Sequence, residues 1–182
     1  LSLKALGIGR GDEVIVPSHT FKATCGVVVN VGAKPVLMDM DGKFEMTEKT
    51  KAIIPVHIAG EMMTFDIGDG TSVPITESWD RQVPVIEDSC QSLESYWVDK
   101  IGRKRMAGTL GSTGCWSFYP AKLLGAYGDA GAITTNDENI ANYIREARNH
   151  FKGTNAEFGG NHRMDNLQAA ILKIQMKRIK RV

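Results

Sequence analysis

Short apolar runs alternate with helical stretches along this chain, and that alternation restricts its fold more than any other feature. Runs such as residues 14–16 are almost continuously apolar, as expected of strands that are covered on both faces. The predicted strands are residues 13–16, 35–38, 52–56, 84–86, 115–118 and 132–135. Strands that alternate with helices predict the α/β class, with helices flanking a sheet.

Two helices are marked by their end signals. The helix predicted over residues 21–31 stops at Gly32, a residue type that commonly ends helices. Thr135 and Glu138 have the spacing of a capping box, which predicts a helix that begins near Asn136. Both helices follow a predicted strand, as the α/β class requires.

Both ends of the sequence resemble parts of helices. Residues 1–6 resemble the tail of a helix that stops at Gly7. Residues 165–182 keep the apolar period of a helix, and we interpret their basic end as a solvated face. We therefore expect residues 1–182 to be the central part of a larger domain. Residues 66–81 are rich in Gly, Thr, Ser and Asp without periodicity, and we predict a loop or a small hairpin insertion there.

Composition narrows the class of protein. A chain of 182 residues that is 42% hydrophobic and 24% charged, with net charge +1, is typical of one soluble globular domain. The near-neutral charge does not favour nucleic-acid binding, and no apolar stretch is long enough to span a bilayer. The 3 cysteines are far apart, which favours a reducing cytoplasm over a disulfide framework, and no His, Cys or carboxylate spacing indicates a metal site.

The ends of three predicted strands carry polar residues that could bind a ligand. In open α/β sheets, ligands bind beyond the carboxyl ends of the strands, where loops and helix N-termini converge. Residues 17–21, 87–91 and 117–122 occupy such positions. The chemistry of this chain is therefore expected in these segments.

Lys122 and Asp88 form the most informative combination among these residues. Lys122 closely follows a strand and precedes a glycine-rich run, so its amine could be partly buried, and the neutral amine is the form that bonds to an aldehyde carbon. Taken alone, an exposed lysine in a flexible loop is the commoner interpretation. Asp88 could simply cap a following helix, but a carboxylate paired with a lysine is the recurrent protein contribution to pyridoxal phosphate.

Several other side chains could contribute, and each has an ordinary structural alternative. Gln91 could reach the same ligand or lie on the surface, and Ser117 could bind phosphate or hydrogen-bond to backbone. Phe21 could stack on a flat ring or belong to the core. His19 and His57 follow strands, but a structural histidine is the more common outcome for both.

Together these motifs resemble the DegT/StrS family of sugar aminotransferases, within the fold-type I group of pyridoxal-phosphate enzymes. The matching segments are residues 5–18, 32–36, 50–57, 85–88 with Gln91, 118–122, 128–132 and 161–165. The resemblance implies the large domain of these enzymes, a three-layer sandwich with a mostly parallel sheet. It also implies that this chain lacks the start of that domain and the C-terminal small domain.

The resemblance assigns a role to each candidate residue. It implies that Lys122 bonds to the cofactor, that Asp88 pairs with the pyridine nitrogen and that Gln91 lies near the phenolic oxygen of the ring. Ser117 is then a phosphate ligand and Phe21 stacks on the ring. The further matching residue is Asn161, which by this resemblance reaches the phosphate of a neighbouring subunit, so that a homodimer shares its active sites.

The implied reaction transfers an amino group from an amino acid, with glutamate expected, to a ketone on a nucleotide-linked sugar. Two alternatives stay open: a related sugar dehydratase, which typically has histidine at the lysine position, and a non-catalytic regulatory protein of the same fold. Residues 41–50 are shorter than usual and residues 66–81 replace a helical segment of the family, so the sugar is not indicated. The upstream Gly-Thr phosphate turn of the family is not in this sequence, and the isolated 182 residues are expected to be weakly active or inactive.

Overall fold

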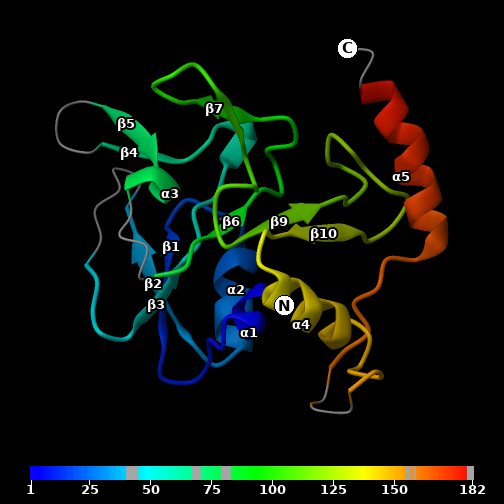
Figure 1. Ribbon diagram of the computed structural model, residues 1–182, viewed down its shortest axis with the longest axis horizontal. Coiled ribbons are helices and arrows are strands. Elements are labelled where there is room, and N and C mark those ends of the chain that lie inside the picture. Colours follow the sequence, from blue (N-terminus) through cyan, green and yellow to red (C-terminus); the bar gives the residue numbers. More distant parts are fainter. Residues whose placement is uncertain (40–44, 67–70, 79–82, 155–156, 158, 180–182) are drawn as a thin grey trace.

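A computed structural model describes residues 1–39, 45–66, 71–78, 83–154, 157 and 159–179 (Figure 1). Its elements, in chain order, are α1 (Ser2–Ala5), β1 (Glu13–Pro17), α2 (Lys22–Asn30), β2 (Lys34–Met38), β3 (Thr50–Ile53), a 3-10 turn (Ile58–Gly60), β4 (Thr64–Asp66), β5 (Ser72–Pro74), α3 (Ile75–Ser78), β6 (Ile86–Asp88), β7 (Tyr96–Val98), β8 (Lys104–Met106), β9 (Thr113–Ser117), β10 (Gly131–Thr134), α4 (Glu138–Ala147) and α5 (Asn166–Ile179). The predicted α/β class is confirmed.

The central sheet is mostly parallel. β1 lies between β2 and β3 and runs parallel to both, while β6 runs parallel to β9 and β10 closes the edge antiparallel to β9. Parallel bridges from Ile53 to Val85 and from Val56 to Asp88 join the two groups of strands. The carboxyl ends of β1, β6 and β9 therefore lie along one edge of the sheet.

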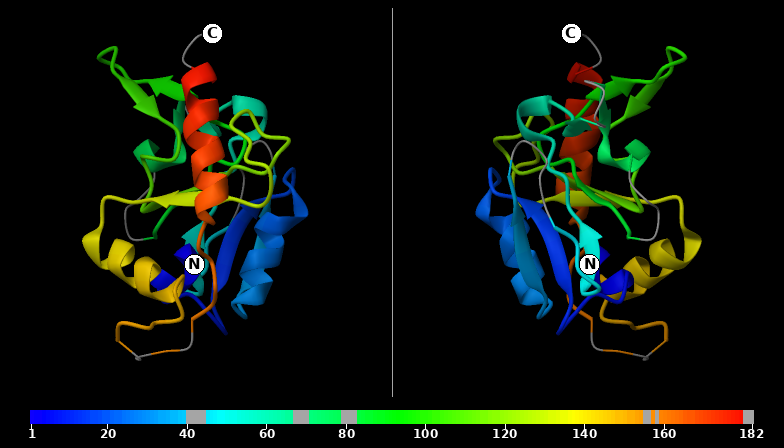
Figure 2. Two further views of the ribbon diagram at one scale, coloured as in Figure 1. Left: turned by 90° about the vertical axis from the view of Figure 1, so that its right-hand side faces the viewer. Right: turned by 90° about the vertical axis from the view of Figure 1, so that its left-hand side faces the viewer.

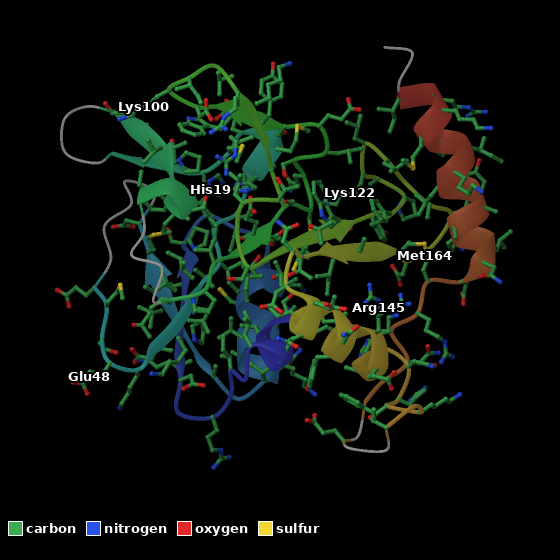
Figure 3. The ribbon with its side chains drawn as sticks, viewed as in Figure 1. His19, Glu48, Lys100, Lys122, Arg145 and Met164 are labelled. Carbon is green, nitrogen blue, oxygen red and sulfur yellow. The ribbon has the colours of Figure 1, made fainter. Side chains whose placement is uncertain are left out.

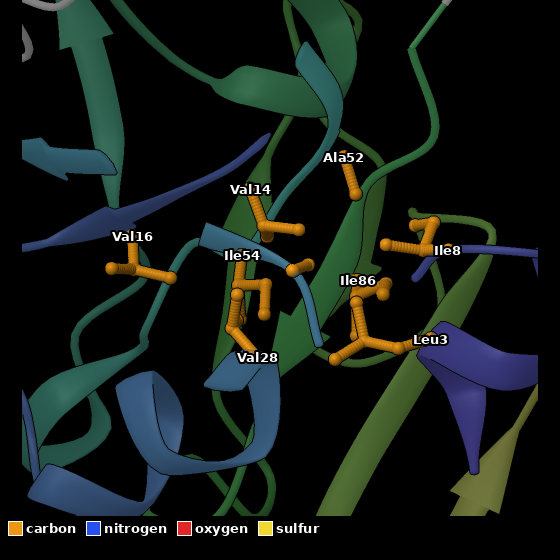
Figure 4. Packing of buried hydrophobic residues seen from close by; sticks show 9 residues of the cluster. Leu3, Ile8, Val14, Val16, Val28, Ala52, Ile54 and Ile86 are labelled. Carbon is orange, nitrogen blue, oxygen red and sulfur yellow. The ribbon is translucent and has the colours of Figure 1, made fainter. Parts of the chain in front are cut away.

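Successive side chains of a strand point to opposite faces, and in β1 the side chains on both faces are buried. Val14 and Val16 pack with Val28 of α2 in one core cluster, which also includes residues of α1 (Figure 4). Ile15 packs with Ile75 of α3 in a second cluster on the other face. Burying each such side chain contributes about 1.5–3 kcal/mol. The continuous apolar run of β1 therefore accounts for the helices that pack on both faces of the sheet.

The helix signals in the sequence are confirmed in part. α2 stops where predicted, and Gly32 has a φ of 85°, a conformation that glycine adopts without steric cost. The cap of α4 was predicted wrongly. Asp137, not Thr135, accepts hydrogen bonds from the N–H groups of Asn139 and Ile140, whereas the hydroxyl of Thr135 donates to the carbonyl of Ser112 and accepts the N–H of Asp137.

The insertion predicted over residues 66–81 contains a hairpin. β4 and β5 pair antiparallel, with Thr64 opposite Pro74, and α3 follows directly. Residues 67–70 and 79–81 of this insertion, and residues 41–44 of the segment 41–50 that was predicted to be shorter than usual, lie outside the described residues. A second antiparallel hairpin, β7 with β8, was not predicted.

α5 lies at one edge of the molecule, apart from α1, α2 and α4, in the views of Figures 1 and 2. Its Leu172 packs with Leu124 and Ala126, so α5 covers the loop that follows β9. Of the helices described here, none combines the length and the apolar character that a membrane span needs.

Candidate active site

Lys122 is held in a compact loop between β9 and β10. Its backbone N–H donates to the carbonyl of Tyr119 over 2.8 Å, which makes a tight turn directly after the strand. A β-carbon at Gly125 would lie 2.5 Å from the carbonyl oxygen of Pro120, so the loop folds closely on itself. Lys122 is half-buried and lies over the β9 and β10 region in Figure 3, whereas Arg145 lies on α4. The loop is thus packed, contrary to the flexible alternative.

A cavity of about 350 Å³ opens beside this lysine. Three of the predicted site residues line it: Gln91, Ser117 and Lys122. Its other lining residues are Ala59, Ser89, Cys90, Leu93, Trp116, Phe118, Ala121, Leu123 and Leu124. The structure therefore brings the lysine, the amide and the hydroxyl together around one cavity, although they come from different segments of the chain.

Asp88 ends β6, immediately before three residues that line this cavity, Ser89, Cys90 and Gln91. Its Oδ2 accepts a hydrogen bond from the hydroxyl of Thr24 over 3.0 Å, and its Oδ1 accepts the N–H of Cys90 over 3.2 Å. The segment after Asp88 is a turn, so this carboxylate does not cap a helix. Both of its oxygens are oriented by donors from α2 and from the turn.

Cys90 lies within the electrostatic influence of both Asp88 and Lys122. Burial raises the pKa of the Cys90 thiol, and the negative charge of Asp88 raises it further, while the positive charge of Lys122 opposes this shift. The thiol therefore stays protonated near neutral pH. Its Sγ contacts the carbonyl oxygen of Cys115 at 3.8 Å. The charges of Asp88 and Lys122 thus both act on the partly buried thiol of Cys90.

Gln91 is anchored by a loop from the preceding part of the sheet. The backbone N–H of Ala59 donates to Oε1 of Gln91 over 2.9 Å. This contact fixes which side of the amide carries the oxygen. Across the described part of the chain, the amide nitrogen of Gln91 donates to no residue, so its N–H groups are available to a ligand in the cavity.

The remaining predicted residues are placed differently. Ser117 ends β9 and its Oγ accepts the N–H of Tyr119 over 3.3 Å, which leaves the hydroxyl proton free for a ligand. Phe21 precedes α2 and is 68% exposed, so it does not belong to the core. Asn161 is exposed, bridges to Asn149 near α4 and does not line the cavity.

A buried ionisable pair below the site was missed by sequence reasoning. His57 and Glu87 are 2% and 1% exposed, and Nε2 of His57 lies 3.0 Å from Oε2 of Glu87. Burial acts to raise the pKa of Glu87, but hydrogen bonds from His57, Gly111 and Gly108 outweigh it and hold the pKa below its ordinary value. The available signal was a glutamate directly after an apolar run, with glycines further along the chain whose backbone can approach it closely.

A larger cavity, of about 1010 Å³, lies between α2, β10 and α4. None of the predicted site residues lines it, and its lining residues include the basic Lys4, Arg145 and Arg148. Volume alone therefore does not identify the site, and the convergence of Lys122, Ser117 and Gln91 favours the smaller cavity. Among the residues that the structure describes, no group of His, Cys, Asp and Glu could hold a metal ion.

The chain is similar to several known proteins. It is 38% identical to a pleiotropic regulatory protein of Geobacillus stearothermophilus, covering 100% of this chain and 49% of that protein. It is 40% identical to the UDP-2-acetamido-2-deoxy-3-oxo-D-glucuronate aminotransferase of Pseudomonas aeruginosa, covering 92% and 47%. The structure matches DesV of S. venezuelae, solved in complex with a ketimine intermediate, with a TM-score of 0.82 and 34% identity, over 99% of this chain and 49% of that one.

The chain thus spans about half the length of the relatives it matches. A similar sequence recurs in proteins that are named as aminotransferases of UDP-linked sugars, and the same architecture recurs in DesV. The sequence profile of the DegT/DnrJ/EryC1/StrS aminotransferase family matches residues 1–182, and the chain belongs to this family.

Proposed function

We propose that the whole protein is an aminotransferase that moves an amino group from an amino acid, with glutamate as the expected donor, to a ketone on a nucleotide-linked sugar. Pyridoxal phosphate is the cofactor of the family. The observation that carries the proposal is the half-buried Lys122 at a cavity shared with Ser117 and Gln91, next to the oriented carboxylate of Asp88. Relatives named as sugar aminotransferases support the class of acceptor.

The residues present fit this cofactor. The cavity of about 350 Å³ is within the usual range for small-molecule sites. Its wall includes Ser89, whose Oγ is buried and hydrogen-bonds to no described residue, so a ligand could satisfy it. Amine, hydroxyl, amide and carboxylate are the groups that an aldehyde, a phosphate, a phenolic oxygen and a pyridine nitrogen require. We propose Lys122, Ser117, Gln91 and Asp88 for these contacts, with Phe21 on the ring face.

Each residue then has a defined task. When bound, pyridoxal phosphate supplies a ring that accepts the electron pair left as a C–H bond of the donor breaks. Asp88 keeps a proton on the pyridine nitrogen through its oriented carboxylate. The Nζ of Lys122, once the donor amine has displaced it, would take the proton from the α-carbon of the donor and deliver it to the former aldehyde carbon of the cofactor, as general base and then general acid.

Two other functions were open for this fold, and Lys122 argues against the first of them. A sugar dehydratase of this family typically carries histidine in place of the lysine, and this chain carries Lys122. A regulatory protein of the same fold is the second candidate, because one relative at 38% identity bears a regulatory name. Bound cofactor without amino transfer in the whole protein would favour that second candidate.

We further propose a cytoplasmic homodimer with shared sites. Cys25, Cys90 and Cys115 are free thiols, which a reducing compartment maintains. Asn161 is exposed and outside the cavity of its own chain, so it is accessible to the site of a second copy. Exposed Tyr127 and Leu123, close to Lys122 in sequence, offer apolar surface near that site.

Addition of glutamate to the whole protein tests the function. We expect the absorption of bound pyridoxal phosphate to convert to that of the pyridoxamine form, and a nucleotide-linked keto sugar to reverse the change. A Lys122→Ala variant should keep the fold and lose the conversion, because the amine that acts as the general base is removed. Conversion at the wild-type rate by this variant would refute the assignment of Lys122.

A further inference from the structure

His57 and Glu87 form a buried pair that the proposed chemistry does not use. The imidazole accepts the backbone N–H of Met63 at Nδ1 over 3.1 Å, so its proton lies on Nε2 and points to Glu87 over 3.0 Å. This pattern fits a neutral imidazole, which donates on one side and accepts on the other. Nδ1 therefore binds the backbone at Met63, and Nε2 binds the side chain of Glu87.

Glu87 is held by four N–H donors. Besides His57, it accepts the backbone N–H of Gly108 over 2.8 Å, of Leu110 over 2.7 Å and of Gly111 over 2.7 Å. A buried carboxylate is costly unless such donors satisfy it, so its position is well determined. Because Glu87 lies in β6, Nε2 of His57 is fixed to that strand. The hydrogen bond at Nδ1 then determines the shape of the loop that follows His57.

The loop over residues 57–63 has a conformation that needs support. Ala59 has a φ of 53° and Gly60 a φ of 88°. A positive φ costs free energy for alanine, because its β-carbon crowds the backbone. The Met63 N–H that bonds to Nδ1 of His57 closes this loop on itself. The strained residue, Ala59, is the one whose N–H holds Oε1 of Gln91 over 2.9 Å.

We propose that His57 is a positioning residue for Gln91. Its Nδ1 closes the loop over residues 57–63, the loop presents the N–H of Ala59, and that N–H turns the amide of Gln91 so that its own N–H groups face the cofactor ring. The inference rests on the proposed binding of pyridoxal phosphate at this cavity. The same contacts explain why His57 is buried and cannot touch a substrate.

Two substitutions separate the roles of the two ring nitrogens. In His57→Asn, the side-chain oxygen occupies the place of Nδ1 and can still accept from Met63, but the donor to Glu87 is lost. In His57→Gln, an amide nitrogen can occupy the place of Nε2, but the acceptor for Met63 is lost. Gln91→Leu serves as the reference for a lost amide, and Ile140→Ala on α4 serves as a control for general destabilisation.

Two quantities are measured in the whole protein. They are the Kd for pyridoxal phosphate and the pH at which the absorption of the bound cofactor changes, here called the spectral pH. We expect His57→Gln to weaken binding about fivefold, the effect of one lost hydrogen bond, and to move the spectral pH in the direction of Gln91→Leu. His57→Asn and Ile140→Ala should keep the wild-type spectral pH even where their Tm falls. Ala59→Gly in the His57→Gln background should recover part of the affinity, because glycine tolerates the positive φ.

The inference is overturned if His57→Gln keeps the wild-type Kd and spectral pH, or if His57→Asn is the variant that moves them. It is also overturned if Gln91→Leu changes neither quantity. Failure of the wild-type whole protein to bind pyridoxal phosphate is a different result, because it contradicts the proposed function itself. Circular dichroism of each variant shows whether the fold is kept, and the double variant provides the test if His57→Gln alone folds poorly.

Discussion

At the scale of single residues, the carboxylate of Asp88 is oriented before any ligand arrives. Thr24 donates to Oδ2 and the N–H of Cys90 donates to Oδ1, while Thr20 lies 2.9 Å from the hydroxyl oxygen of Thr24. Because Thr24 uses its proton on Asp88, Thr20 is the donor in that second contact. A hydroxyl chain of this kind keeps the charge of Asp88 in one position.

Replacement of Asp88 with asparagine should lower amino transfer by the whole protein by at least about a hundredfold. The amide cannot hold a proton on a pyridine nitrogen as a carboxylate does, so the ring accepts electrons poorly. Steady-state kinetics with glutamate measure the loss, and circular dichroism shows that the fold is kept.

The isosteric variant Thr24→Val is the graded control for this prediction. It keeps the carboxylate but removes one charge-assisted hydrogen bond, so a loss of about tenfold is expected. Turnover near the wild-type value in Asp88→Asn would remove the role of this carboxylate, whatever Thr24→Val does.

Much of this residue set could be predicted from the sequence. Lys122, Ser117 and Gln91 follow strands whose carboxyl ends share an edge, so the topology rule alone brings them together. The partners of Asp88 and Gln91 could not be predicted, because Thr24 and Ala59 reach them from distant segments. Such contacts depend on tertiary packing and leave no local pattern.

At the scale of elements, α4 depends on a cap that the sequence pattern misassigned. Both Thr135 and Asp137 are good capping residues, and local sequence cannot decide between them. The hydroxyl of Thr135 is held by the carbonyl of Ser112, which is distant in sequence, and its oxygen accepts the N–H of Asp137 rather than that of a helix residue. The hairpin of β7 and β8 was missed for another reason: its strands are short, β7 is Tyr-Trp-Val and β8 is Lys-Arg-Met, so neither shows an alternation of apolar and polar residues.

Asp137→Ala should destabilise the protein by about 1 kcal/mol, the usual cost of losing an N-cap. Its carboxylate accepts from the N–H of Asn139 over 2.8 Å and from that of Ile140 over 3.2 Å. Denaturant unfolding measures the loss, and the neighbouring exposed Asn136→Ala is the matched control. Equal unfolding midpoints for the two variants would contradict the cap.

At the scale of the whole molecule, Glu87 connects stability to pH. Its pKa in the folded state lies below the ordinary value of 4.5. A carboxylate with a lowered pKa contributes stability that is fully present above the unfolded pKa and is lost as the pH falls through the folded one. That share of the stability should therefore disappear as the pH falls below 4.5.

Glu87→Gln tests this contribution. The variant should be less stable than the wild type at pH 7, and the difference in unfolding free energy should shrink as the pH is lowered below 4.5 toward the folded pKa. Urea unfolding at a series of pH values measures it. A difference that stays constant across this range would show that the carboxylate does not titrate as described.

The proposed sharing of active sites between two subunits predicts complementation between two inactive variants. Lys122→Ala and Asn161→Ala chains, mixed under conditions that allow subunit exchange, form mixed dimers in which one site has both residues intact. Random pairing should restore about a quarter of the wild-type activity. No recovery after proven exchange would place Asn161 and Lys122 in the same chain's site or remove the role of Asn161.

Borohydride reduction of the whole protein with pyridoxal phosphate, followed by peptide mass mapping, tests the central assignment most directly. The half-buried amine at the cavity should be the covalent attachment point, so we expect a pyridoxyl adduct on the peptide that carries Lys122. An adduct on another lysine, or none despite bound cofactor, would contradict the assignment.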